Sequence, residues 1–236
     1  MEWSWRAASR VEAFDEVWVA TDDEEIAAAV EDFGGTAVLT DPSHPSGTDR
    51  VAEAASRPEA RRHRLVVNYQ ADELFLDPGA AARSVEAVAG EEAGVATVAA
   101  PLEREEAWRS ESVVKVVRDG RGDALYFSRA PIPHPRGGSP DLSGAPDGPW
   151  LRHLGLYAFT RPALERWTSL EPSPLERIER LEQLRALQAG MRIRVVTGPP
   201  TEPGVDEPED LRRAERILAN QRADGSPGRE PPVGRG

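Results

Sequence analysis

Short apolar runs alternate with helical patterns along most of the chain, and this alternation restricts the possible folds more than any other feature. Residues 16–21 (EVWVAT) and 65–70 (LVVNYQ) are apolar and β-branched, which is typical of buried strands. A stretch with helical periodicity follows each of them, at residues 23–33 and 78–89. Strands that alternate with helices predict an α/β protein with a parallel or mixed sheet covered on both faces.

The same patterns predict the remaining elements. We expect further strands at residues 36–39, 95–100, 113–118, 124–127, 153–159 and 193–196. We expect further helices at residues 48–56, 161–167, 175–189 and 208–220. Residues 131–149 are crowded with Pro, Gly, Ser and Asp, which predicts a long irregular loop. Residues 221–236 have almost no apolar side chains, so we expect one domain over residues 1–220 followed by a disordered tail.

Composition excludes several classes of function. The chain has 236 residues, no cysteine and a net charge of −12, so it has no zinc–thiolate site and no thiol nucleophile, and nucleic acid is not an expected partner. No apolar run approaches the roughly 20 residues that a membrane helix needs, and the first residues lack the apolar core of a signal peptide. We therefore expect a cytoplasmic protein without a membrane partner, in which a metal ion or local arginines hold any anionic substrate.

Two acidic residues are candidate metal ligands. Asp72 follows the strand at residues 65–70, and ligands of open α/β sheets bind outside the carboxyl ends of the strands. A carboxylate there suits Mg²⁺, which takes few protein oxygens together with substrate phosphates, although a polar turn residue would give the same pattern. Asp206 is the second candidate. It also fits as the N-cap of the helix at 208–220, with Glu209 at a capping-box spacing.

Three further segments are candidate binding sites, each with a plainer alternative. Residues 46–50 (SGTDR) open a helix, where backbone N–H groups can bind an anion or a polar base, but the string also suits an ordinary helix start. Arg129 follows a strand and could bind a carboxylate bidentately, or it is a surface arginine. His153 and Tyr157 lie four apart on one predicted strand and therefore share a face, as many core residues do.

Several longer strings carry a family resemblance. HPSGTDRVAEAA, VVNYQADE, ALYFSRAPIP, RHLGLYAF, EPSPLERIERLEQLRAL and GVDEPEDL occur in this order over roughly residues 3–218. Together they resemble the CMP-Kdo synthetases, the 3-deoxy-manno-octulosonate cytidylyltransferases. LEQLR after PSPLE separates this family from other sugar nucleotidyltransferases. The resemblance implies a three-layer α/β/α nucleotide-diphospho-sugar transferase fold with a mixed, mostly parallel sheet. It also implies a homodimer, magnesium as cofactor, and the conversion of CTP and Kdo to CMP-Kdo and pyrophosphate for lipopolysaccharide-type glycans.

The resemblance also implies roles for individual residues. Asp72 and Asp206 would be the magnesium carboxylates, and Arg129 would bind the carboxylate of the sugar acid. The other substrate-binding residues that it implies are Ser46, Gly47, Thr48, Arg50, Gln70, His153, Tyr157, Glu182 and Gln183. Periodicity alone places Glu182 and Gln183 in an amphipathic helix, and the polar face of such a helix is usually exposed to solvent.

The chain departs from the family at two places. Ala71 and Leu74 stand where the family has glycine and proline around the acid, and Tyr69 replaces a small aliphatic residue. The family also opens with a strand and a phosphate-binding loop, P-A-R-x-x-S-x-R-L-P-G-K, upstream of the helix to which residues 1–11 correspond. Without that strand we expect unpaired backbone groups and an apolar slot in the sheet. Without the loop we expect no transfer of CMP. We favour a start codon upstream of Met1 over a true truncation.

Two alternatives remain open from the sequence. One is a non-catalytic truncated homologue that binds nucleotide or sugar acid. The other is a cytidylyltransferase for a different sugar acid.

Overall fold

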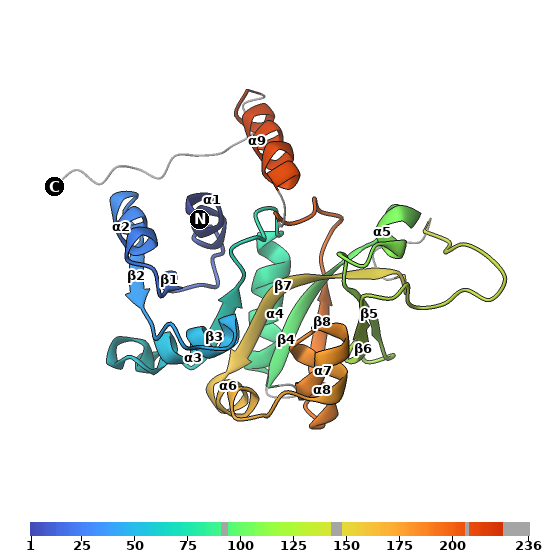
Figure 1. Cartoon of the computed structure of the whole chain (residues 1–236), viewed down its shortest axis with the longest axis horizontal. Helices are drawn as coiled ribbons and strands as arrows, with labels where there is room; N and C mark the ends of the chain where they lie inside the picture. Colours follow the sequence, from blue (N-terminus) through green and yellow to red (C-terminus); the bar gives the residue numbers. More distant parts are fainter. Residues whose placement is uncertain (91–93, 143–147, 206–207, 224–236) are drawn as a thin grey trace.

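The structure is a computed structural model that describes residues 1–90, 94–142, 148–205 and 208–223 (Figure 1). Its strands are β1 (Trp18–Thr21), β2 (Thr36–Leu39), β3 (Leu65–Tyr69), β4 (Val95–Pro101), β5 (Lys115–Arg118), β6 (Ala124–Ser128), β7 (Leu151–Thr160) and β8 (Ile193–Thr197). Its α-helices are α1 (Glu2–Ala8), α2 (Glu24–Asp32), α3 (Gly47–Ser56), α4 (Pro78–Ala89), α5 (Glu105–Arg109), α6 (Arg161–Thr168), α7 (Pro174–Glu179), α8 (Gln183–Gln188) and α9 (Pro208–Ala223). A 3₁₀ helix, η1, spans Pro58–Arg62.

The long strand β7 organises the larger sheet. β4 pairs antiparallel with β7 along nearly its whole length, while β3 and β5 pair antiparallel with different halves of its other edge. β8 is parallel to β4, and β6 forms an antiparallel hairpin with β5. Four strands, β3, β4, β5 and β8, therefore run in one direction. The mixed, mostly parallel sheet predicted from the sequence is confirmed.

A second, smaller sheet consists of β1 and β2, which pair in parallel. In the described part of the chain, β1 pairs only with β2 and β3 only with β7, so each has one edge without a neighbouring strand. A cavity of about 800 Å³ lies between these two edges, with α1 and α3 contributing to its walls. The structure thus has an open space at the place where the sequence predicts a slot.

Helices pack on both faces of the larger sheet, giving three layers (Figure 1). On one face, Phe159 and Trp167 lie in a core cluster that includes residues of α6 and α8. On the other face, Val98 and Leu156 pack against Ala80 of α4. Neighbouring residues of a strand point to opposite faces, so an almost wholly apolar strand such as β4 can serve both cores.

The single helix expected at residues 175–189 is wrong, because the structure contains two short helices there. α7 ends at Arg180, whose backbone is left-handed (φ 54°, ψ 48°), and α8 begins after Glu182. The two helices fold back on each other through a buried ion pair in which Arg185 binds both oxygens of Glu176, at 2.5 and 2.8 Å. This tertiary contact stabilises the break. It moves Glu182 and Gln183 from a solvated helix face to the interior.

The last helix, α9, continues three residues beyond the expected residue 220. Residues 224–236, which contain most of the predicted tail, lie outside the described residues. A helix with the length and apolarity for crossing a membrane does not occur in the described ranges.

Candidate active site

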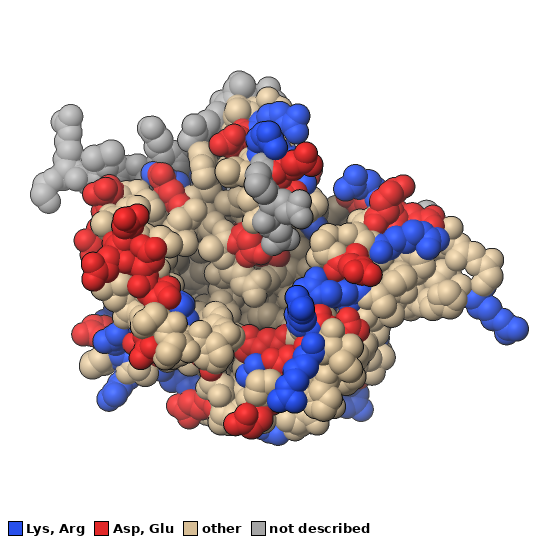
Figure 2. Space-filling view, in the orientation of Figure 1, with Lys and Arg blue, Asp and Glu red and all other residues tan. Residues whose placement is uncertain are grey.

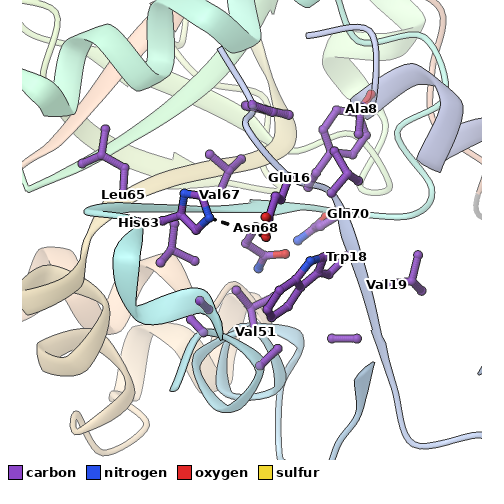
Figure 3. Close-up of a pocket in the computed structure, with 18 of the residues that line it drawn as sticks. Ala8, Glu16, Trp18, Val19, Val51, His63, Leu65, Val67, Asn68 and Gln70 are labelled. Carbon is purple, nitrogen blue, oxygen red and sulfur yellow. Dashed lines mark ion pairs between the residues drawn. The ribbon is translucent and has the colours of Figure 1, made fainter. Parts of the chain in front are cut away.

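Two cavities meet at the carboxyl end of β3. The first is the space between β1 and β3, and Figure 3 shows Trp18, Val51, Asn68 and Gln70 around it. The second, of about 1240 Å³, lies between the first half of β7, the segment around α5, the start of α8 and the segment before α9. The space-filling view shows this face hollowed at its centre (Figure 2). Both cavities are lined by Thr48, Gln70, Asp72 and Glu182.

Most of the site residues predicted from the sequence lie around these two cavities. Arg129, His153, Tyr157 and Gln183 line the second, and Gly47 and Arg50 line the first. Ser46 lines neither, but its side chain accepts a hydrogen bond from Asp49 N at 3.2 Å and so caps α3. Asp206 lies outside the described residues. The fold therefore brings residues as far apart in the sequence as Gly47 and Gln183 to two adjoining cavities.

Asp72 occupies the turn after β3, at the junction of the cavities. Its carbonyl oxygen accepts a hydrogen bond from Val205 N at 3.0 Å. Gly204 also approaches closely, since a Cβ at that position would lie 3.1 Å from the same oxygen. The replacement of glycine by Ala71 causes no backbone strain, because Arg180 is the only non-glycine residue with a positive φ in the described ranges.

Asp72 is the described residue best placed to hold a magnesium ion. Nowhere in the described ranges do three or more His, Cys, Asp or Glu side chains converge on a possible metal position. Mg²⁺ does not require such a cage, because it binds one or two carboxylates together with substrate phosphates and water. A half-buried carboxylate that faces two connected cavities fits that requirement.

Gln70 crosses close to β7. Gln70 N donates to the carbonyl of Gly155 at 2.9 Å, and a Cβ at Gly155 would overlap the Gln70 amide. Gly155 N in turn donates to the buried carboxylate of Glu73 at 2.6 Å. The glycine of HLGLY therefore allows the Gln70 side chain to pass over β7.

Arg50 is directed toward the smaller sheet. Its Nη1 donates to Thr40 Oγ1 at 2.6 Å and lies 3.2 Å from Asp22 Oδ1. The guanidinium therefore links α3 to the loops that follow β1 and β2, along the wall of the first cavity.

Glu182 connects three elements. Its Oε1 accepts a hydrogen bond from Trp167 Nε1 at 2.6 Å, and its Oε2 accepts one from Thr48 Oγ1 at 3.0 Å. Asn68 Nδ2 donates to the same threonine oxygen at 3.4 Å. Burial raises the pKa of the Glu182 carboxyl, while the hydrogen bonds from Trp167 and Thr48 act in the opposite direction.

His153 and Tyr157 share a face of β7, as their spacing predicts. Their ring centroids are 5.2 Å apart. Burial lowers the pKa of His153 to about 3, so the imidazole is neutral at physiological pH. Burial raises the pKa of the Tyr157 hydroxyl, and a side-chain contact with Thr97 acts in the opposite direction.

Arg129 is held in place by backbone carbonyls. Its Nε donates to Glu179 O and its Nη1 to Glu111 O, both at 2.9 Å. Lys115 Nζ donates to the carbonyl of Arg129 itself at 2.5 Å and to two further carbonyls. Burial lowers the pKa of Lys115 to about 8. The chain's single lysine therefore fixes the loop that carries Arg129.

Sequence reasoning missed two residues that hold the predicted ones. Trp167 binds Glu182, and Thr97 lies 2.8 Å from His153 through its hydroxyl. Neither has a local pattern that separates it from other core residues. It also missed further arginines that line the second cavity beside Arg129: Arg104, Arg152, Arg180 and Arg213.

The mixed α/β/α sheet, the carboxylate at a strand end and the two adjoining cavities fit a nucleotidyltransferase. A family model described as "Cytidylyltransferase" matches residues 1–193. The 3-deoxy-manno-octulosonate cytidylyltransferase of Methylococcus capsulatus is 49% identical over 211 residues, which cover 87% of this chain and 82% of the relative. The enzyme of that name from Anaeromyxobacter sp. strain K is 51% identical over 216 residues, 90% of this chain and 84% of the relative. The chain therefore belongs to the 3-deoxy-manno-octulosonate cytidylyltransferase family.

Solved structures agree with this assignment. A CMP:2-keto-3-deoxy-manno-octonic acid synthetase complexed with CTP superposes with a TM-score of 0.82 at 37% sequence identity, over 93% of this chain and 87% of that one. A 4-diphosphocytidyl-2C-methyl-D-erythritol synthase, with a TM-score of 0.54 and 17% identity, shares the fold alone.

Proposed function

We propose that this protein transfers CMP from CTP to 3-deoxy-D-manno-octulosonate (Kdo) and releases pyrophosphate. The observation that carries the proposal is the junction of two cavities at Asp72, Gln70, Thr48 and Glu182. A transferase must bind two substrates with their reacting atoms in contact, and two cavities that share one wall provide that arrangement. The names of the relatives supply the substrates.

The second cavity takes the sugar acid in this proposal. Kdo carries one carboxylate and several hydroxyl groups, and this cavity is lined by arginines, carboxylates and neutral polar groups. Arg129 has a planar guanidinium whose remaining N–H groups can bind the carboxylate. Glu182, Gln183 and the hydroxyl of Tyr157 line this cavity and can bind sugar hydroxyls. The N-terminal turn of α3 and Gln70 lie beside the nucleotide.

The reaction then needs no covalent enzyme intermediate. The anomeric hydroxyl oxygen of Kdo forms a bond to the α-phosphorus of CTP, while the bond from that phosphorus to the bridging oxygen breaks. Pyrophosphate takes the electron pair and leaves in line, and the hydroxyl proton passes to solvent. The protein's contribution is to orient the two substrates and exclude water between them.

Magnesium is part of the proposal as the cofactor. Asp72 would hold it, with Asp206 as the expected second carboxylate. When bound, the ion neutralises charge on the triphosphate and withdraws electrons from the phosphorus that is attacked.

We also propose a homodimer that acts in the cytoplasm, where CTP is made. Support comes from the family resemblance alone. Sedimentation equilibrium tests the dimer, since a mass near twice 25.7 kDa is expected and a mass of one chain contradicts it.

An acceptor-selectivity assay tests the proposed function. Pyrophosphate release is measured with CTP and Mg²⁺ in three reactions, with Kdo, with N-acetylneuraminate or without an acceptor, using the protein as its gene encodes it. We expect release with Kdo only. Faster release with N-acetylneuraminate would mean that this sugar acid, and not Kdo, is the preferred substrate. Release without any acceptor would identify a CTP hydrolase instead.

A further inference from the structure

Thr97 lies on β4 beneath the second cavity and is completely buried. Its hydroxyl contacts the carbonyl oxygen of Leu156 at 2.7 Å and Nε2 of His153 at 2.8 Å, and it also interacts with the side chain of Tyr157. The β4–β7 pairing is irregular at this point, because Thr97 pairs with Tyr157 but the next residue of β4 pairs with Leu154. This bulge places the Leu156 carbonyl beside the threonine hydroxyl.

The proton positions in this group follow from the chemistry of its members. A carbonyl oxygen can only accept a hydrogen bond, and a hydroxyl has one proton to donate. The 2.7 Å contact therefore uses the Thr97 proton for the Leu156 carbonyl. The Thr97 oxygen is left to accept, so the 2.8 Å contact requires a proton on Nε2 of His153. A neutral imidazole with its proton on Nε2 has an unprotonated Nδ1.

The other nitrogen of His153 faces the ligand space. His153 lines the second cavity, and its Nδ1 has no hydrogen-bond partner among the described residues. The side chain is half-buried and forms part of the cavity wall. The ring itself is held between Phe127 and Tyr157, each with its centroid 5.2 Å away. The imidazole therefore presents a fixed lone pair to whatever occupies the cavity.

We propose that Thr97 is a positioning residue that fixes the proton of His153 on Nε2, so that Nδ1 accepts a hydrogen bond from a hydroxyl group of the sugar acid. This inference rests on the proposed function and specifies how the sugar acid is oriented in the cavity. A lone pair attracts an O–H donor and repels a carboxylate. The carboxylate of Kdo is therefore directed away from His153, toward the arginines of the same cavity.

The test compares Thr97→Val, which keeps the branched shape and removes the hydroxyl, with Thr97→Ser, which keeps the hydroxyl. The first measurement uses ¹⁵N-histidine labelling and NMR without substrate, and His153→Gln identifies the signal among the four histidines. We expect neutral His153 with its proton on Nε2 in the wild type and in Thr97→Ser. In Thr97→Val we expect the form with the proton on Nδ1 to appear. A wild-type proton on Nδ1 would overturn the proposal.

Steady-state kinetics supply the second readout. We expect Thr97→Val to raise KM for Kdo about tenfold, the effect of one hydrogen bond at the upper end of the usual range, and to leave KM for CTP within about twofold. Thr97→Ser should restore the KM for Kdo. Equal increases in both constants, or no increase for Kdo, would contradict the proposal. If the wild type does not use Kdo at all, the proposed function fails, while the NMR result still decides where the proton lies.

Discussion

Trp167 donates its indole N–H to the carboxylate of Glu182 over 2.6 Å, and this bond joins α6 to the start of α8. The carboxylate's other oxygen accepts from Thr48 in the first turn of α3. Three helices far apart in the sequence thus meet at one carboxylate in the cavity wall. The hydrogen bond from Trp167 is charge-assisted when Glu182 is ionised and fixes the orientation of the carboxylate toward the ligand space.

Replacement of this tryptophan tests that relationship. Trp167→Phe keeps an aromatic ring in the core and removes the N–H. We expect the free energy of unfolding to fall by about 2 kcal/mol, because hydrogen bonds to charged groups are worth about 1.5–3 kcal/mol. KM for Kdo should rise more than KM for CTP. Trp108→Phe is the matched control, since the buried Nε1 of Trp108 has no partner in the described ranges and its loss should cost little. Equal effects of the two substitutions on stability and KM would contradict the role of Glu182.

Glu182 also predicts a dependence of stability on pH. Burial raises its pKa above the ordinary value of 4.5. Between that value and the higher pKa of the folded state, the folded protein holds a proton that the unfolded chain has released. The stability from protonated Glu182 is therefore complete below the unfolded pKa and is lost as the pH rises through the folded pKa.

The measurement compares the wild type with Glu182→Gln by urea unfolding from pH 4 upward. The free energy of unfolding of the wild type minus that of the variant should decrease above about pH 4.5, by at most about 1.4 kcal/mol per pH unit, and then level off. A difference that increases with pH would mean that the pKa is lowered in the folded protein.

The proposed metal position predicts a loss of activity without a loss of structure. Asp72→Asn keeps the shape of the side chain and removes the charge, and its backbone contact with Val205 does not depend on that charge. We expect transfer to fall by at least about 100-fold, the order of magnitude for losing one preorganised electrostatic contact. Asp206→Asn should have a similar effect. Glu31→Gln, on the exposed surface of α2, changes the net charge equally and serves as the control. Near-normal turnover in both aspartate variants would show that neither Asp72 nor Asp206 binds a metal ion that the reaction requires.

The guanidinium of Arg129 predicts a selective effect on one substrate. Arg129→Lys retains the charge but loses the planar arrangement of donors. We expect KM for Kdo to rise by about tenfold or more and KM for CTP to change little, because one bidentate contact is lost. Some loss of stability is also expected, since Nε and Nη1 bind two carbonyls. Michaelis constants measured at a temperature where both proteins are folded separate the two effects. Equal changes for both substrates would place Arg129 beside the triphosphate instead.

The sequence was sufficient to predict most elements of the larger sheet. Strands such as β3 and β4 consist mostly of apolar residues, because both faces of the sheet are covered, and this signal is local. The position of His153 and Tyr157 on the same face of β7 also followed from a local rule, the alternation of side chains along a strand.

The break between α7 and α8 could not be predicted in this way. Arg180 adopts a backbone conformation that usually favours glycine, so its residue type gives no indication of a helix end. The ion pair between Glu176 and Arg185 that supports the break is visible only once the chain is folded. The contacts of Trp167 with Glu182 and of Thr97 with His153 likewise join separate elements. The predicted role of Asp206 stays a prediction, because that residue lies outside the described ranges.

The most direct test of the central claim is product analysis by ³¹P NMR with CTP, Kdo and Mg²⁺, using the protein as its gene encodes it. We expect a new phosphodiester signal, that of CMP-Kdo, which grows in equal amounts with pyrophosphate and fails to appear when EDTA is present or when Asp72 is replaced by asparagine. If a folded wild-type protein binds both substrates but forms no phosphodiester, the proposed reaction is contradicted. Pyrophosphate formed without the phosphodiester would contradict it as well.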